Sequence, residues 1–166
     1  MNRIILVVLL AFVLIASQLP AADSAGQFEK MKSLAGEWQG KSPDGKNVTV
    51  SYELVSNGSA LMERMAGENE PNMITMYHLD GANLMMTHYC SAMNQPRMRA
   101  EAGEANAIHF TFIDATNLAK STDGHMHKLT ITFKDENHIN HAWTFSQNDQ
   151  EQTMMFDLER KTMTQK

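Results

Sequence analysis

KLTITFK, residues 128–134, decides the fold class of this sequence. Its apolar residues occupy every second position and are separated by lysine and threonine. A period of two places one set of side chains on each face of a β-strand. The stretch therefore predicts a strand with one face in a core and the other in water. The apolar set is Leu129, Ile131 and Phe133.

The same alternation recurs along the chain and is interrupted by short turn signals. Asn57-Gly58 and Asp80-Gly81 are dipeptides typical of tight hairpin turns. Many short strands joined in this way predict an all-β sandwich or barrel, and a barrel leaves no unpaired edge. The pattern therefore predicts about ten short antiparallel strands in one domain, as a sandwich or a closed barrel, preceded by a short helix at 27–34. The predicted strands are 37–41, 48–54, 60–65, 73–79, 84–90, 97–101, 107–113, 128–134, 138–145 and 152–160.

One segment, Asp114–Met126, shows no clear strand pattern. At about 13 residues it is longer than a usual hairpin loop, so we expect an irregular lid or functional loop.

Several motifs carry a resemblance to known proteins. LAGEWQGK at 34–41 resembles the Gly-x-Trp opening of lipocalin-like (calycin) barrels, in which the first strand follows a short helix. Other stretches resemble a group of small secreted bacterial proteins of unknown function. The resemblance implies a calycin-like barrel in an exported bacterial protein, and it implies no established activity. The stretches are GSALMERM (58–65), MITMYHLDG (73–81), LMMTHYC (84–90), NQPRM (94–98), DATNL (114–118) and GHMHKLTITF (124–133).

The N-terminus has the three regions of a secretory signal peptide. Arg3 supplies a positive charge, Ile4–Ala16 is an apolar run, and small residues follow at 21–26. The run is shorter than the roughly 20 residues that a membrane-spanning helix needs. We therefore predict a signal peptide at 1–25, cleaved somewhere within 21–25, and an exported single domain at 26–166, periplasmic or extracellular.

The charge balance narrows the class of partner. The formal net charge is −5, and the sequence contains no basic run. A mildly acidic domain of this kind is not expected to bind nucleic acid or an anionic membrane surface. We expect a small-molecule partner, whereas the oligomeric state stays open.

The Asp80-Gly81 turn predicts which side chains face the interior. A two-residue turn there would pair Leu79 with Ala82 and, further along, Met73 with His88. The more apolar face of this hairpin then contains Tyr77, and His88 and Cys90 point inward with it. His127 shares the parity of the inward residues of 128–134, so we expect it inside, and His125 shares this parity too if the strand starts early enough.

Two interpretations of these histidines remain open. Imidazole and thiolate groups are good metal ligands, so His88, Cys90, His125 and His127 are candidates for a metal or haem site. Alternatively, the histidines are satisfied by Glu63 or a backbone carbonyl, and Cys90, the single cysteine, fills space in the core or acts as a redox thiol.

The sequence lacks the common motifs of hydrolases, metalloproteases and phosphate-binding enzymes. Trp38 is expected to be a packing anchor, and Trp143 to be either core or cavity wall. Arg97 is either solvated or paired with Glu63 or a ligand carboxylate.

We predict a non-enzymatic barrel that needs no cofactor and binds a small, partly apolar ligand. The alternatives are a metal- or haem-dependent protein or enzyme, and a module that binds protein at its rim. The candidate ligand-binding residues are Glu63, Tyr77, His88, Cys90, Arg97, His127 and Trp143.

Overall fold

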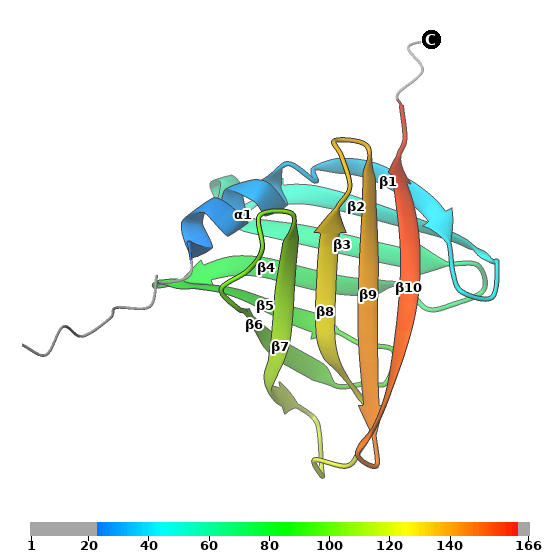
Figure 1. Cartoon of the computed structure of the whole chain (residues 1–166). Coiled ribbons are helices and arrows are strands. Elements are labelled where there is room, and N and C mark those ends of the chain that lie inside the picture. The colour runs from blue at the N-terminus through cyan, green and yellow to red at the C-terminus, as the bar shows by residue number, and fades with distance from the viewer. Residues whose placement is uncertain (1–22, 163–166) are drawn as a thin grey trace, which may run out of the picture.

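The computed structural model of this protein describes residues 23–162, which form a closed antiparallel barrel with a helix at one end (Figure 1). This confirms the predicted all-β barrel. The predicted signal peptide lies almost entirely outside the described residues. The elements are α1 (Ser24–Lys32), β1 (Gly36–Lys41), β2 (Asn47–Val55), the 3₁₀ turn η1 (Ser56–Gly58), β3 (Ala60–Gly67), β4 (Met73–Asp80), β5 (Asn83–Tyr89), β6 (Gln95–Ala100), β7 (Ala107–Thr116), β8 (His125–Phe133), β9 (His138–Gln147) and β10 (Gln150–Arg160).

Each strand pairs with the next one along the chain, and β1 pairs with β10 to close the barrel. Trp38 is opposite Arg160 at this seam, and Lys41 is opposite Asp157. The seam needs a glycine at position 40, because a Cβ atom there would lie 2.1 Å from the Asp157 carbonyl oxygen. The first and last strands therefore approach closely enough to complete the hydrogen-bonded wall.

Helix α1 covers one end of the barrel. Asp23 caps it by accepting a 2.9 Å hydrogen bond from the Gly26 amide, and its buried residues include Phe28 and Met31. The Ser24 hydroxyl donates a 2.7 Å hydrogen bond to the Ala82 carbonyl in the β4–β5 turn. The predicted helix is confirmed in kind, although it begins three residues earlier than expected because of the Asp23 cap.

Trp38 anchors the covered end, as the sequence predicts. Its side chain is fully buried, and its indole N–H donates a 2.8 Å hydrogen bond to the Leu34 carbonyl. The Arg160 guanidinium lies 4.2 Å from the Trp38 ring and donates to the carbonyls of Ser33 and Ala35, each at 2.8 Å. These contacts join the end of α1 to the last strand.

The opposite end of the barrel has no helix among the described residues. Because the strands alternate in direction, this end is formed by the segments 42–46, 68–72, 90–94, 117–124 and 148–149. We call it the open end.

Two sequence-based expectations need correction. The irregular segment is 117–124, because β7 continues through Thr116 and β8 begins at His125. Polar contacts hold the extension of β7 in the sheet: Thr116 donates a hydrogen bond to Gln95, and Asp114 pairs with Arg97. Polar residues of this kind give no apolar alternation from which the strand could be predicted.

The register of β4 against β5 also differs from the expected one. The turn consists of Gly81 and Ala82, so that Asp80 is opposite Asn83 and Thr75 is opposite His88. Gly81 has φ of 57°, which suits glycine in a tight turn. The register is shifted by two residues, and because side chains alternate with a period of two, the shift leaves the inward face unchanged.

Candidate ligand-binding cavity

A cavity of about 190 Å³ extends into the barrel from the open end. Its entrance includes Glu70 and Ser91, which are exposed and lie in loops. Its deep end includes His88 and Trp143, each 2% exposed. The walls between are largely apolar and include Met65, Met73, Met126, Met154 and Phe156. The lining thus combines apolar walls with two buried side chains that carry polar nitrogens.

His88 is held in place by its neighbours in the barrel. Its Nδ1 lies in a 2.9 Å hydrogen bond with the Thr75 hydroxyl, and its ring centroid is 4.6 Å from that of Trp143. Burial lowers the pKa of His88 to about 4, because a charged imidazole would lose its hydration. The ring is therefore neutral at physiological pH.

Both residues at the deep end carry a nitrogen without a partner. Among residues 23–162, neither Nε2 of His88 nor the indole Nε1 of Trp143 has a hydrogen-bond partner. Buried polar atoms are normally paired, so each such atom requires an explanation. The two nitrogens belong to side chains that line the same cavity.

A polar network lies in the barrel around Glu63, which is 1% exposed. The Tyr77 hydroxyl donates a 2.6 Å hydrogen bond to Oε2 of Glu63, and the nearby Tyr52 hydroxyl, like that of Tyr77, acts to lower the pKa of this carboxyl group. Burial nevertheless raises the pKa of Glu63 to about 7, because desolvation outweighs both tyrosines. The carboxyl group can therefore gain or lose a proton near neutral pH.

The network continues to His141 on β9. Nε2 of His141 lies 2.8 Å from the Tyr52 hydroxyl, and Nδ1 has no hydrogen-bond partner within the described part of the chain. Burial lowers the pKa of His141 to about 3. Neither Glu63 nor His141 is among the residues that line the cavity. The acid–base groups of the network therefore do not line the cavity.

The sequence-predicted residues divide into two groups. His88 and Trp143 line the cavity, while Glu63 and Tyr77 form the network beside it. Arg97 does not reach Glu63: it forms a 2.5 Å ion pair with Asp114 on the outer surface. Of the two predicted alternatives for Arg97, the structure therefore agrees with a side chain exposed to solvent rather than one paired with Glu63.

Cys90 lies just after β5 in a turn rather than in the inward strand position that was expected. It is half-buried and packs against the edge of the core, and its Sγ accepts a 3.5 Å hydrogen bond from the Ala92 amide. The Cys90 carbonyl accepts from the Met93 amide, which closes the turn. The strand ends one residue too early for Cys90 to share the cavity with His88.

A β-bulge between Met126 and Lys128 displaces His127 from the predicted inward position. Met126 lines the cavity in its place, because one extra residue reverses the alternation beyond the bulge. Nε2 of His127 is instead 3.9 Å from Glu151, and its Nδ1 is 3.1 Å from Nε2 of His125. Both imidazole rings pack against Phe112.

The four candidate metal ligands therefore do not converge. His88 is bound to Thr75 inside the barrel, while His125 and His127 are bound to each other. No group of three or more His, Cys, Asp or Glu side chains that could hold a metal ion is found in the described range 23–162.

Tyr52, Thr75 and His141 lie within predicted strands but were not selected as site residues from the sequence. Tyr52 and His141 are 89 positions apart in the sequence. Alternation within each strand predicts that the two side chains are buried, whereas their contact with each other depends on how the barrel closes. The cavity-lining role of Met126 could not be predicted, because nothing in the local sequence marks the bulge.

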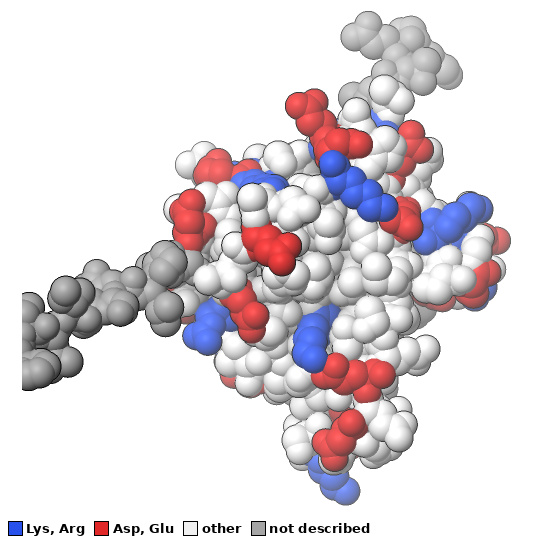
Figure 2. All heavy atoms as spheres, viewed as in Figure 1, with Lys and Arg blue, Asp and Glu red and all other residues white. Residues whose placement is uncertain are grey.

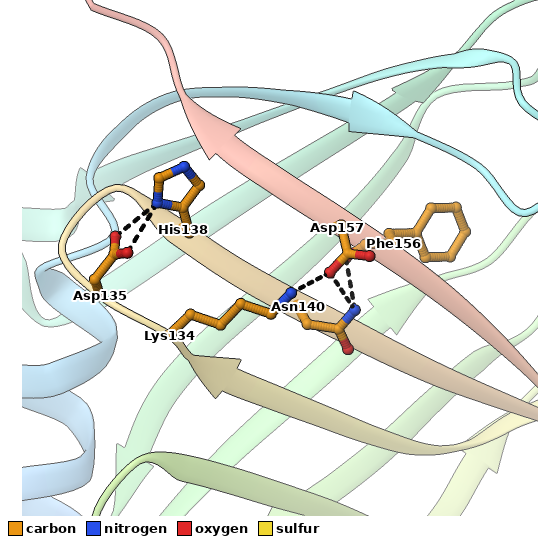
Figure 3. A network of polar contacts seen from close by, with 6 residues as sticks. All are labelled: Lys134, Asp135, His138, Asn140, Phe156 and Asp157. Atoms are coloured by element: carbon orange, nitrogen blue, oxygen red, sulfur yellow. Dashed lines mark hydrogen bonds and ion pairs between the residues drawn. The ribbon is translucent and has the colours of Figure 1, made fainter.

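A second depression, larger and more open, lies on the barrel wall near β1, β9 and β10, with a volume of about 770 Å³. Four of its lining side chains take part in the polar contacts that Figure 3 shows: Lys134, Asp135, His138 and Asp157. Asp157 accepts hydrogen bonds from Lys134 at 2.5 Å and Asn140 at 3.1 Å, and His138 pairs with Asp135 at 2.9 Å. These groups are already satisfied, so the depression is a weaker candidate than the cavity.

The outer surface that Figure 2 shows carries charges of both signs. Acidic and basic side chains are interspersed over the face that Figure 2 shows, and neither sign forms a continuous block there. No described helix is long and apolar enough to cross a membrane.

Comparison with known proteins supports the fold and gives no sequence family. No protein-family model matches the chain, and no curated protein matches it. Among solved structures, a protein of unknown function from the DUF3598 family of Nostoc punctiforme PCC 73102 is similar, with a TM-score of 0.52 and 12% identity. The alignment covers 79% of this chain but only 49% of that protein, so the chain spans about half its length.

A second similar structure is EF1p2_mFAP2b bound to DFHBI. The TM-score is 0.40 at 8% identity, and the alignment covers 81% of this chain and 98% of that one. At these identities the comparisons bear on the fold alone.

Proposed function

We propose that this protein is an exported binding protein that holds a small, partly apolar ligand in the cavity at the open end of the barrel. The observation that carries the proposal is the pair of unpartnered nitrogens on His88 and Trp143, two buried side chains that line an apolar cavity. Leaving a buried polar atom unpaired costs about 1–3 kcal/mol. A ligand that supplies the missing partners recovers this free energy.

The cavity volume suits a small ligand. An engineered protein cavity of roughly 150 Å³ is large enough to bind benzene. The present cavity of about 190 Å³ has apolar walls of the same character. It can therefore hold a compound of about one ring, with a polar group directed toward His88 and Trp143.

The placement of the acid–base groups favours binding over catalysis. A general acid or base must come within hydrogen-bonding distance of the group on which it acts. Glu63 and His141 are bonded to tyrosines and do not line the cavity, and His88 is neutral and bonded to Thr75. This arrangement supports ligand retention without chemical change.

Export is proposed from the N-terminal sequence. The apolar run and the small residues after it have the pattern of a cleaved leader. A binding protein outside the cytoplasm would meet its ligand directly in the surrounding medium.

The proposal is tested by native mass spectrometry of the protein purified from its own host. The wild-type protein should retain a small molecule that acid denaturation releases. Met154→Trp should lose it because Met154 lines the cavity, whereas Met155→Trp is the matched control because Met155 is 52% exposed. Wild-type protein that carries no compound and binds none from a mixture of small aromatic and aliphatic probes would overturn the proposal, as would equal retention by the two variants.

A further inference from the structure

The cavity walls contain an unusual set of sulfur atoms. Four of the lining residues are methionines: Met65, Met73, Met126 and Met154. They come from β3, β4, β8 and β10 and therefore surround the space from several sides. Thioether sulfurs make favourable contacts with aromatic rings, and flexible methionine side chains adapt to the outline of a ligand. The walls thus favour a flat aromatic ring over an aliphatic chain.

The two unpartnered nitrogens restrict the polar group of the ligand. The indole N–H of Trp143 can only donate a hydrogen bond, so it needs an acceptor. Nε2 of a neutral His88 is a donor or an acceptor, depending on which nitrogen carries the proton in the hydrogen bond with Thr75. A hydroxyl oxygen both accepts and donates. A hydroxyl group therefore has the donor and acceptor capacity that Trp143 and either tautomer of His88 require.

The charges around the cavity restrict the ligand further. Of the described residues, no lysine or arginine lines the cavity, and the carboxylate of Glu70 lies at its entrance. His88 is neutral because of its burial. An anionic ligand would therefore be buried without a counter-charge, which is costly.

From these three observations we infer that the ligand is a neutral, single-ring aromatic compound bearing a hydroxyl group. The ring lies between the four methionines, and the hydroxyl bonds to Trp143 and His88. This inference rests on the proposed binding function and specifies the chemical class of its ligand.

The test uses phenol, toluene and benzoate as probes of the folded protein, whose methionine methyl groups are labelled with ¹³C. Phenol should bind about tenfold or more tightly than toluene, because one added pair of hydrogen bonds to buried groups gives a ratio of this size. Benzoate should bind more weakly than both. The methyl signals of the four lining methionines should shift, whereas that of exposed Met155 should not.

Two variants separate hydrogen bonding from shape. Trp143→Phe keeps an aromatic ring but removes the N–H, so the preference for phenol over toluene should fall several-fold. Trp38→Phe is the matched control, because Trp38 bonds to Leu34 at the covered end and does not line the cavity. If Trp143→Phe does not fold, His88→Leu provides the same comparison.

The outcomes distinguish this inference from the proposed function. Equal affinities for phenol and toluene would overturn the hydroxyl assignment and leave ligand binding in place. Tightest binding of benzoate would overturn the neutral class. If no probe shifts the four methyl signals, the ligand class is wrong, and retention of a host compound in native mass spectrometry then decides whether the binding function itself stands.

Discussion

The Tyr77 hydroxyl donates a 2.6 Å hydrogen bond to Oε2 of Glu63, and both residues are buried inside the barrel. They belong to neighbouring strands, and Tyr52 is directly opposite Glu63 on the other side. Two tyrosines thus face one carboxyl group whose pKa burial raises to about 7. The free energy of unfolding should therefore depend on pH, and substitutions of Glu63 and Tyr77 should change that dependence.

The first prediction concerns Glu63→Gln and the pH dependence of the free energy of unfolding. A raised carboxyl pKa gives a stabilising contribution below the ordinary value of 4.5 that is lost as the pH rises toward about 7. The lowered pKa values of His88 and His141 act in the opposite direction, because their contribution is present above 6.5 and is lost as the pH falls. Between about pH 4.5 and 6.5 the Glu63 contribution therefore opposes that of the histidines.

In Glu63→Gln this opposition disappears. The free energy of unfolding should rise with pH more steeply than in the wild type, by about 1.4 kcal/mol per pH unit. Urea denaturation at several pH values between 4.5 and 6.5 measures the slope, and Glu159→Gln is a control at an exposed position. Parallel curves for wild type and Glu63→Gln would show that Glu63 does not titrate as proposed.

The second prediction concerns the Tyr77 hydroxyl. Tyr77→Phe removes a donor from a buried carboxyl group and should lower the free energy of unfolding by about 1–3 kcal/mol. The loss should be larger at pH 8 than at pH 5, because ionised Glu63 depends more on its donors than the protonated acid does. Urea denaturation at both pH values tests this, with Tyr89→Phe as control because Tyr89 is 50% exposed. Equal losses at the two pH values would contradict the charge-dependent role.

The third prediction concerns Arg160, which joins α1 to the last strand. Its guanidinium donates to the carbonyls of Ser33, Ala35 and Glu136 and lies over the ring of Trp38. Arg160→Lys keeps the charge but cannot reproduce this forked geometry. We expect a loss of about 1–3 kcal/mol in stability and faster amide hydrogen exchange within 24–32. Unchanged exchange, together with the same stability as the exposed-site control Arg64→Lys, would show that the contacts do not hold the helix.

The fourth prediction places leader cleavage within the expected window. Asp23 caps α1, and Ser24 is buried and bonded to Ala82. Cleavage before Asp23 retains both contacts, whereas cleavage after Ala25 removes them. N-terminal sequencing of the exported protein should therefore give Ala22 or Asp23 as the first residue. A mature chain beginning at Gly26 would contradict this choice, and a retained Met1 would contradict cleavage altogether.

The sequence pattern predicted the buried face along the middle of the regular strands, although Leu79, which shares the face of Tyr77, is 40% exposed at the end of β4. Period-two alternation depends only on backbone geometry, so the inward positions of Tyr77, His88 and Trp143 followed even though the expected β4–β5 register was shifted by two residues. The alternation gave the wrong facing for His127, because a bulge inserts one residue into the strand there. The alternation also could not predict which interior side chains contact each other. Tyr52 and His141, for example, come into contact only because the barrel closes.

Arg97 illustrates a different limit. Its partner Asp114 lies at the start of the segment expected to be an irregular loop, and the strand there is stabilised by polar contacts rather than by an apolar face. Hydrophobic periodicity therefore gave no signal for the strand or for the ion pair that it contains.

The seam between β1 and β10 also determines when the barrel no longer has a free strand edge that could pair with another chain. Strands β1–β9 can pair in sequence as hairpins, but the outer edge of β1 has no partner until residues 157–160 are in place. Until then the nascent protein presents a free strand edge beside an apolar interior, the combination that recruits other chains. Because this last pairing joins segments from opposite ends of the described chain, it closes the longest loop of any strand pair in the barrel. Pairing of β10 with β1, rather than formation of any hairpin, is therefore the step that removes the last free strand edge.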